Sequence, residues 1–480
     1  MEFELTADAA AAADLGRLKA LAANRDGRPR SRSVKIVWHD SPEHRLLADG
    51  LALSEQRGMW RLERMVPGQD TWLPAQPAPV VAEPPDLTTL PSPLAPLAAF
   101  EGRRTSSVHR FGGASVTLTV QRGMLRAVTA EQPVARILLS GEEAAVHMAA
   151  RLIAEAIFVA VPLASLAAEA IALATGRAPA ARHRGAPVLP DTVTGVPEAL
   201  AHIIGHLTDV MLSYGPRVDG LDGAGTEAVH QMRVAVRRAR SAMSIFRPVV
   251  EADALDAVDS SLKALGGQLG PSRDWDVFAE ETIPALREAL AGDQRLERLA
   301  SAAFRRRRAH RAALDAYLAG ADFRKLGIEL AWFAAAQSWR VTTAATPLTL
   351  TAFGAAVLRH RWKKLLGAGK RLEELDMPGL HAVRLRAKRA RYAAEMFATV
   401  FPGKAAHRFI RRLSSLQQRL GVLNDGAVAT DLLEELGGAS GRHAYGAGVV
   451  AGFMAARARK IRPRVILAFD KFSRQPTYWS

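Results

Sequence analysis

The sequence predicts an α+β protein, in which an N-terminal antiparallel β domain with helices precedes an all-α C-terminal domain. Three observations lead to this prediction: short β-like runs early in the chain, helical periodicity throughout the later part, and a repeat within that helical part. The chain has 480 residues, of which 49% are apolar and none is cysteine. This length usually corresponds to about two or three domains, and without cysteine neither a disulfide framework nor a thiolate metal site can form.

The β-like runs are separated by Gly, Pro and Asp, which mark turns between strands. They are Phe3–Leu5, Val34–Trp38, Leu51–Leu53, Met59–Leu62, Ser115–Val120 and Val134–Leu139. Residues 67–97 are proline-rich and predict an extended loop, and the pattern turns helical from Glu142 to Thr175. We therefore predict a first domain at 1–176 and a linker rich in Pro, Gly and small residues at 177–197.

Neither end of this first domain indicates a membrane protein. The most apolar stretch, residues 144–174, is interrupted by three charged residues and a proline, whereas a membrane span needs about 20 predominantly apolar residues. The opening residues, MEFELTADAA, place no basic leader before an apolar run, so a secretory signal is not predicted. A cytoplasmic protein without a membrane span is the expectation.

The helical part contains an internal repeat. VHQMRVAVRRARSAMSIF begins at Val229, and LHAVRLRAKRARYAAEMF begins at Leu380, 151 residues later. The register then holds without a gap, because Leu269-Gly270 meets Leu420-Gly421 and Asp274 meets Asp425. A repeat of this length predicts two copies of one helical unit. We assign the two pseudo-symmetric halves to 198–345 and 346–475, each with about four to six helices.

Positive charge is concentrated in the same part of the chain. Residues 1–195 contain 21 basic and 20 acidic residues, whereas residues 196–480 contain 43 basic and 28 acidic ones. Charge segregated in this way indicates a polyanionic partner, such as nucleic acid, a membrane surface or another polyanion. The alternative is an ordinary protein with many surface arginines.

The repeated segment places basic residues along one side of a helix. His230, Arg233, Arg237 and Arg240 fall within an arc of roughly 80°, and His381, Arg384, Lys388 and Arg391 occupy the same positions in the second copy. Like charges one turn apart repel each other, so a structural helix would usually place acids between them. Residues 228–246 and 379–394 nevertheless contain no Asp or Glu. Arginine forms two parallel charge-assisted bonds with phosphate, so the two stripes predict a phosphate-binding surface with the apolar side facing the core.

Further candidate binding residues flank the stripes or lie in other basic runs. They are Arg238, Arg389, Arg306, Arg308, Arg359 and Arg459. For the basic runs the alternative is a solvated helix face. Asp274 and Asp425 follow glycines that are expected to end helices, so we predict that each caps the next helix. No cofactor and no catalytic residue is predicted.

These motifs resemble the CHAD family, the conserved histidine α-helical domain. The matching features are HxxRVxxRRxR at His230–Arg240, HxxRLxxKRxRY at His381–Tyr392 and LGxxND at Leu420–Asp425, within a resemblance that covers about residues 196–475. The resemblance implies two pseudo-symmetric helical halves around a basic groove that binds inorganic polyphosphate. It also implies localisation to polyphosphate or storage granules, whose proteins would then be partners.

The N-terminal part resembles, more weakly, the CYTH or triphosphate-tunnel family. Glu2-Phe3-Glu4 begins like that family's ExExK strand, and residues 37–53 and 58–64 resemble two later segments. Thr6 replaces the lysine, Ser54, Glu55 and Gln56 replace expected arginines, and Val134–Gly141 has no carboxylate. Triphosphate hydrolysis needs several carboxylates for a divalent metal. We therefore predict a degenerate domain without hydrolytic activity, in which Glu2 and Glu4 are vestigial metal-ligand candidates.

Two alternatives to polyphosphate binding remain open from the sequence. One is an active, metal-dependent triphosphatase or polyphosphatase of the CYTH type. The other is a nucleic-acid binder, because basic helices attract any phosphodiester backbone in a salt-dependent way. The sequence shows no signature of a known nucleic-acid-binding motif, so only weak, non-specific binding to nucleic acid is expected.

Overall fold

The computed structural model describes residues 1–65, 75–177, 185–215, 223–250, 252–336 and 349–479. The chain divides into two compact units. The first, here the sheet unit, comprises Met1–Gly185, Ile204–Ser213 and Ala319–Ser338, and the second, here the helical unit, comprises Ala186–Ile203, Tyr214–Leu318 and Trp339–Ser480. Residues 178–184 of the predicted linker, and the predicted boundary between the helical halves at 345–346, lie outside the described residues.

The strands of the described residues form one antiparallel sheet, in the order β5–β4–β3–β2–β6–β7–β8–β1–β9. Each predicted β-like run lies within a strand, so these predictions are confirmed. Strand β6 was not predicted, because its polar centre, EGRRTSS, hides the alternation expected of a strand. The strands are β1 (Glu2–Ala7), β2 (Arg25–Asp40), β3 (Leu51–Gln56), β4 (Met59–Arg64), β5 (Val80–Ala82), β6 (Ala95–Phe111), β7 (Ala114–Arg126), β8 (Glu131–Gly141) and β9 (Val159–Ala160).

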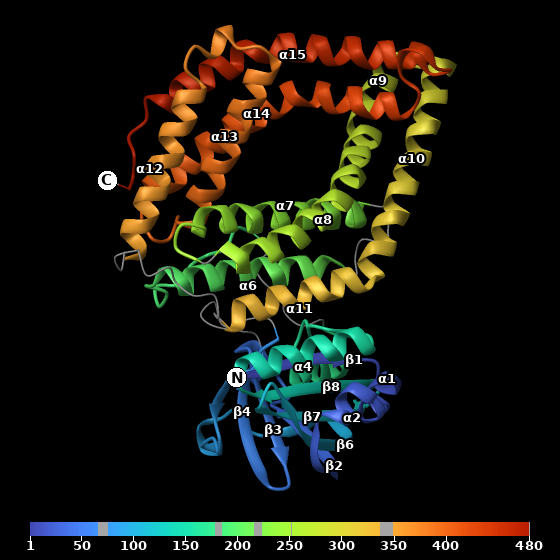
Figure 1. Ribbon diagram of the computed structural model, residues 1–480, viewed down its shortest axis with the longest axis vertical. Coiled ribbons are helices and arrows are strands. Elements are labelled where there is room, and N and C mark those ends of the chain that lie inside the picture. The colour runs from blue at the N-terminus through green and yellow to red at the C-terminus, as the bar shows by residue number, and fades with distance from the viewer. Residues whose placement is uncertain (66–74, 178–184, 216–222, 251, 337–348, 480) are drawn as a thin grey trace. The chain divides into compact units, whose positions relative to one another are not determined.

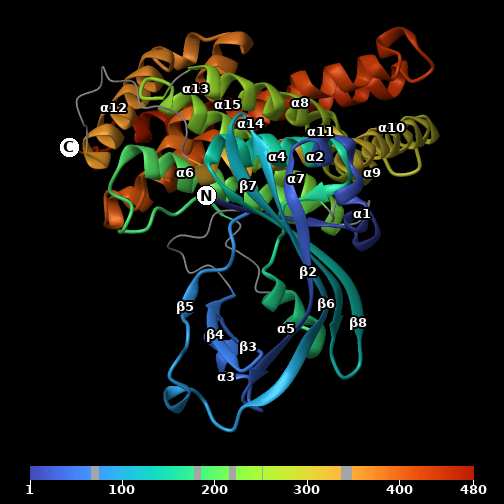
Figure 2. The ribbon, with the colours of Figure 1, turned by 60° about the horizontal axis from the view of Figure 1, so that its bottom comes forward.

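The long strands curl strongly around the inner face of the sheet (Figure 2). Where β6 and β7 pair, Gly102 lies opposite Gly123, and a Cβ atom on Gly102 would lie 2.2 Å from the carbonyl oxygen of Arg122. Glycine therefore permits a close backbone approach at this point. The segment before β5 bridges β1 and β4, since the Glu4 N–H donates to the Ala75 oxygen at 2.6 Å and the Arg64 N–H to the Pro79 oxygen at 2.9 Å.

Helices pack on both faces of this sheet. On one face, α4 contributes Val146 and Ile153 to a core that contains Phe3 and Leu5 of β1. On the other face, α5 packs with Trp38 and its neighbours. The predicted helical stretch from 142 to 175 is thus confirmed, as two helices with a short break. The helices of this unit are α1 (Ala9–Ala13), α2 (Lys19–Ala23), α3 (Arg45–Ala48), α4 (Glu143–Ala156), α5 (Leu166–Thr175) and α11 (Ala321–Ala336).

Helix α11 is distant in sequence from the rest of the sheet unit but contributes to its core. The Trp332 ring stacks on the imidazole of His147 with centroids 4.5 Å apart and meets the edge of Phe3 at 5.5 Å. The His147 Nε2 lies 3.1 Å from the Glu329 carboxylate. This packing could not be predicted from the sequence, because the apolar pattern of α11 resembles that of every other helix after residue 198.

The helical unit contains no strand in its described residues, as predicted. Residues 204–213 of its first helix, α6, belong to the sheet unit. No helix within the described ranges is long and apolar enough to cross a membrane. The helices are α6 (Val196–Tyr214), α7 (Gly223–Phe246), α8 (Ala252–Val277), α9 (Ile283–Ala289), α10 (Gln294–Ala319), α12 (Leu350–Ala368), α13 (Met377–Met396), α14 (Lys404–Glu435) and α15 (Ala444–Ser473) (Figure 1).

The order of these helices repeats at the predicted offset. Shifted by 151 residues, α10 covers 445–470, and α15 spans Ala444–Ser473. In the same way α6, α7 and α8 correspond to α12, α13 and α14. The apolar side of α7 is buried as predicted, since Met232, Ala239 and Phe246 are all 0% exposed. Their repeat partners in α13 and just beyond it, Val383, Ala390 and Phe397, are buried as well.

The predicted helix ends before Asp274 and Asp425 are wrong. Helix α8 continues through Gly266, Gly267 and Pro271, and α14 continues through Gly421, so both aspartates lie inside helices and cap nothing. A glycine inside a helix costs about 1 kcal/mol relative to alanine. Burial of apolar side chains such as Leu262, Leu265 and Leu269 outweighs that cost.

Candidate anion-binding site

The two repeat halves bring basic side chains together around one pocket of about 260 Å³, here the repeat pocket. Helices α7 and α8 supply one part of its wall, and α13, α14 and α15 supply the other. Its charged and polar lining residues are His230, Arg233, Arg237, Arg273, Asp274, Glu281, Thr282, Arg384, Asn424, Asp425 and Arg457. Five arginines thus converge on the pocket, and the first and last of them, Arg233 and Arg457, are more than two hundred residues apart in the sequence.

Arg233 is held in place by α8. Its Nη1 donates to the backbone oxygen of Gly270 at 2.6 Å and lies 3.3 Å from a carboxylate oxygen of Asp274. The repeat partner of Arg233, Arg384, lies near Asp425 in the equivalent way, since Asp425 acts electrostatically on it. Each aspartate that was predicted to cap a helix therefore faces the arginine of its own half.

Among the described residues, three basic groups in or beside the pocket make no direct contact with an acid. Within the parts of the chain that the structure describes, Arg237, Arg384 and Lys388 form no hydrogen bond and no ion pair. The Nε of Arg237 is buried without a hydrogen-bond partner. An unfilled buried donor is costly, so these side chains favour a bound acceptor.

The electrostatics of the site show how closely these charges are packed. Burial, together with Arg237, Arg384, Arg233 and Arg391, lowers the pKa of Lys388 to about 7. Burial also lowers the pKa of Arg237 and Arg384, again with help from neighbouring arginines. The pKa of His230 is lowered first by burial and then by Arg273. A bound anion would oppose all of these shifts, because it stabilises the charged forms.

The two aspartates are perturbed in the opposite sense. Burial raises the pKa of Asp274, although Arg233 and Arg237 act against it. Burial likewise raises the pKa of Asp425, although Arg457 and Arg384 act against it. Each carboxyl also adjoins arginines that an anion would contact, so we interpret both as groups that orient arginine side chains.

Several predicted residues are paired with acids instead of lining the pocket, two of them across neighbouring helices. Arg238 of α7 pairs with Glu395 of α13 at 2.9 Å, and Arg391 lies 3.5 Å from the same carboxylate. Arg240 pairs with Asp259 of α8 at 2.8 Å. The absence of acids within each stripe therefore did not mean that every stripe residue is unpaired, because folding supplies acids from other helices.

The remaining predicted residues do not line the repeat pocket. His381 is exposed, and its Nδ1 contacts the Asn424 side chain. Arg306 lies 3.5 Å from Glu435. Four arginines are exposed and line no part of the pocket: Arg308, Arg359, Arg389 and Arg459.

Sequence reasoning missed Arg273 and Arg457 as lining residues. A signal for Arg457 was present, because it is the repeat partner of Arg306, which was a candidate. Arg273 has Asn424 as its repeat partner, so the repeat gave no signal for it. Asp274 and Asp425 were predicted to cap helices. Their actual position inside long helices depends on tertiary packing, which the sequence pattern does not display.

In the sheet unit, the two vestigial metal-ligand candidates are placed differently. Glu2 is exposed, and its Oε1 accepts a hydrogen bond from Ser140 at 3.3 Å. Glu4 lies on the inner face of the sheet, 3.8 Å from the Nε of Arg136. Burial raises the pKa of Glu4, and Arg136 opposes this shift.

Residues 198–434 match the CHAD domain family model, so this region of the chain is a CHAD domain. The crystal structure of the CHAD domain from the plant Ricinus communis is similar, with 26% sequence identity and a TM-score of 0.53, over 62% of this chain and 98% of that one. PptA from Streptomyces chartreusis matches with 18% identity and a TM-score of 0.44, over 57% and 99% of the two chains. No curated protein was found to match.

Proposed function

We propose that this protein binds inorganic polyphosphate in the repeat pocket, as a binding protein and without chemistry at that site. One observation carries the proposal: arginines from both repeat halves converge on a single pocket, while Arg237, Arg384 and the neighbouring Lys388 form no hydrogen bond and no ion pair among the described residues. The resemblance to the CHAD family implies the same ligand. Inside the fold, this excess of charge is unfavourable unless an anion is bound.

Polyphosphate fits this arrangement better than a nucleic acid does. It is a linear chain with charge on every unit and no bases, so it requires only cations and hydrogen-bond donors. Nucleic-acid channels usually add aromatic rings on which bases stack. The aromatic ring that lines the repeat pocket, Phe278, is only 2% exposed and offers no stacking platform.

The test is calorimetric titration of the full chain with long-chain polyphosphate at two salt concentrations, beside the same titration with duplex DNA. We expect saturable polyphosphate binding that is much tighter than DNA binding. The double variant Arg237→Gln, Arg384→Gln should bind polyphosphate at least about tenfold more weakly, because each charge-assisted bond contributes about 1.5–3 kcal/mol.

The matched control is the double variant Arg308→Gln, Arg359→Gln, which removes the same charge from exposed positions outside the pocket. It should lose little affinity. Equal loss in both variants, or equally tight binding of DNA, would mean that the protein presents only a basic surface.

The same binding would place the protein on polyphosphate or storage granules. A fluorescent fusion of the full chain should then coincide with polyphosphate staining in cells. The Arg237→Gln, Arg384→Gln variant should be diffuse, and an unchanged granular pattern in that variant would show that another surface directs localisation.

A further inference from the structure

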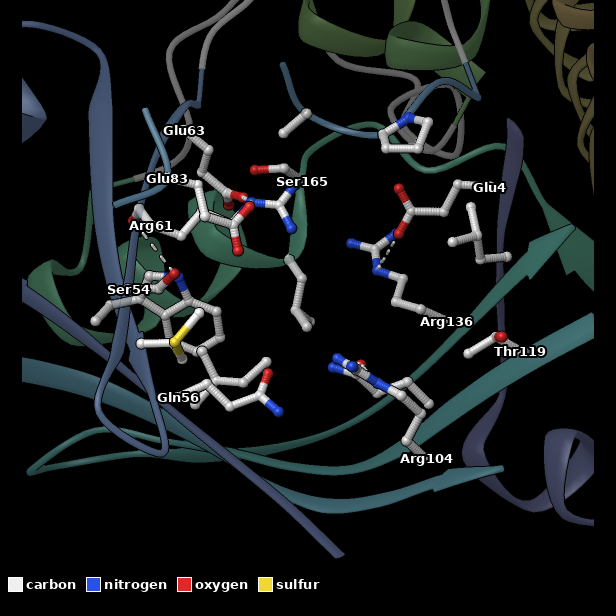
Figure 3. Close-up of a pocket in the computed structure, with 18 of the residues that line it drawn as sticks. Glu4, Ser54, Gln56, Arg61, Glu63, Glu83, Arg104, Thr119, Arg136 and Ser165 are labelled. Atoms are coloured by element: carbon white, nitrogen blue, oxygen red, sulfur yellow. Dashed lines mark hydrogen bonds and ion pairs between the residues drawn. The ribbon is translucent and has the colours of Figure 1, made fainter. Parts of the chain in front are cut away.

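The sheet unit contains a larger cavity that the polyphosphate proposal does not use. It lies on the inner face of the curled sheet, has a volume of about 730 Å³, and is here called the sheet cavity (Figure 3). The residues that matter for its chemistry are Glu4, Arg61, Glu63, Glu83, Arg104 and Arg136. They come from strands throughout the sheet and from the segment after β5.

Arg136 of β8 is a buried arginine whose hydrogen bonds are incomplete. Its side chain is 5% exposed and pairs with Glu169 at 2.9 Å, and its Nη2 donates to the Ala164 oxygen at 2.9 Å. The Nε and Nη1 atoms are buried and have no hydrogen-bond partner. The guanidinium points into the cavity beside Glu4 (Figure 3). A buried cation with unfilled donors is costly, so this geometry favours an acceptor from a ligand.

Arg104 of β6 reaches into the same cavity from another wall (Figure 3). The side chain of Gln121 fixes it, because its Nε and Nη2 both donate to the Oε1 atom at 3.0 and 2.7 Å. Burial lowers the pKa of Arg104, and the nearby charges of Arg32 and Arg61 lower it further. Two of its donors are thus committed to one amide, and the rest of the fork remains for a ligand.

The carboxylates of the cavity are arranged around arginines. Arg61 lies 3.8 Å from Glu63 and 3.9 Å from Glu83. Glu4 faces Arg136. Each glutamate therefore has a cation next to it, which disfavours a divalent metal at the same carboxylates. This arrangement differs from the metal-dependent chemistry that the CYTH resemblance implies.

The charge and the apolar lining of the cavity indicate the class of ligand. Five arginines line it, Arg32, Arg57, Arg61, Arg104 and Arg136, against the three glutamates. A phosphate monoester carries about −1.5 to −2 at neutral pH, which matches this excess better than one carboxylate does. Apolar side chains, among them Ile36, Trp38, Leu138 and Leu166, complete the lining and suit a small apolar group.

We propose that the sheet cavity binds a phosphate monoester with a small apolar group, and that Arg136 and Arg104 hold its phosphate directly, without a metal ion. The polyphosphate site of the helical unit is separate from this one, because the two pockets share no lining residue.

The probe is 4-fluorophenyl phosphate, and its binding to the full chain is followed by fluorine NMR in the presence of EDTA. We expect binding that Arg104→Gln weakens at least about tenfold, the loss expected for one charge-assisted bond. The matched control is Arg103→Gln, because Arg103 is the next residue of β6, is exposed and does not line the cavity. This control should bind as the unaltered protein does.

Arg136→Lys provides a second test, since it keeps the buried charge but removes the planar fork; it should also weaken binding. The proposal is overturned if neither variant changes the affinity, if binding is lost instead in Arg237→Gln, Arg384→Gln, or if it requires added Mg²⁺. Binding of 4-fluorobenzoate as tight as that of the phosphate would overturn the assigned ligand class.

Discussion

Lys388 is the basic residue whose protonation responds most directly to its surroundings. Burial and four neighbouring arginines lower its pKa to about 7, whereas a lysine in water has a pKa of about 10.4. At neutral pH a large share of the protein therefore carries a neutral Lys388 when no anion is bound. The second repeat half has lysine where the first has Arg237, so only one of the two stripes can lose charge in this way.

We expect polyphosphate affinity to fall as pH rises from 6 to 8. A bound polyanion raises the pKa of Lys388, so binding takes up a proton wherever the free protein has lost it. For one proton, the affinity then falls by at most about tenfold per pH unit. Acidification favours the charged form of His230 and the neutral forms of Asp274 and Asp425. Wherever these three groups titrate, they therefore change the affinity in the same direction as Lys388.

Lys388→Arg isolates the contribution of the lysine, because arginine stays charged throughout this range. The variant should bind more tightly than the unaltered protein at pH 8 and should show a shallower pH dependence. Calorimetry at pH 6, 7 and 8, in two buffers with different ionisation enthalpies, measures the proton uptake. An identical slope in the variant would assign the pH dependence to the other groups.

At the scale of elements, one ion cluster joins α8 to α10. Asp276 is 0% exposed. One of its oxygens lies 2.7 Å from the Nε of Arg307, and the other lies 2.8 Å from the Nη2 of Arg311. Arg307 also contacts Glu280 and donates to Thr226 at 3.0 Å. The run of arginines at 305–308 is therefore divided, with Arg307 inside the fold and its neighbours at the surface.

Asp276→Asn should lower the free energy of unfolding by about 3–5 kcal/mol, because it leaves two buried arginines without their shared anion. Urea unfolding followed by circular dichroism measures the change. Asp256→Asn is the control, since Asp256 pairs with Arg247 at the surface and exposed pairs contribute little. Similar losses in the two variants would show that the buried cluster has no special role.

At the scale of the whole molecule, the sheet unit is built from three separate parts of the chain. Its core includes Ile328 and Trp332 of α11, which lie far along the sequence from β1 and α4. A boundary drawn after residue 195 would therefore separate core residues from their partners.

We expect a fragment of residues 1–195 to melt at a lower temperature than the sheet unit of the full chain. It lacks Trp332, and loss of a large buried aromatic side chain typically costs about 3–5 kcal/mol. Joining residues 319–336 to the fragment through a flexible linker should restore part of the loss. Calorimetric melting of the three proteins tests this, and equal melting temperatures would show that α11 adds nothing to the core.

The sequence by itself determined the α+β class, the change from strands to helices, and the repeat at 151 residues. These features depend on local periodicity and on similarity between segments, both of which are present in a linear sequence. It also singled out Arg233, Arg237, Arg384 and His230, which line the repeat pocket, because a stripe of like charge on one side of a helix depends only on residue spacing.

Only the tertiary structure decided which basic residues share a pocket. It paired Arg238 with Glu395 and Arg240 with Asp259, and it brought Arg273 and Arg457 beside the repeated stripes. It also extended α8 and α14 through their glycines, enclosed the sheet cavity and placed α11 in the core of the sheet unit. Each of these depends on contacts between residues distant in sequence, where burial and charge pairing outweigh the local preferences that a sequence displays.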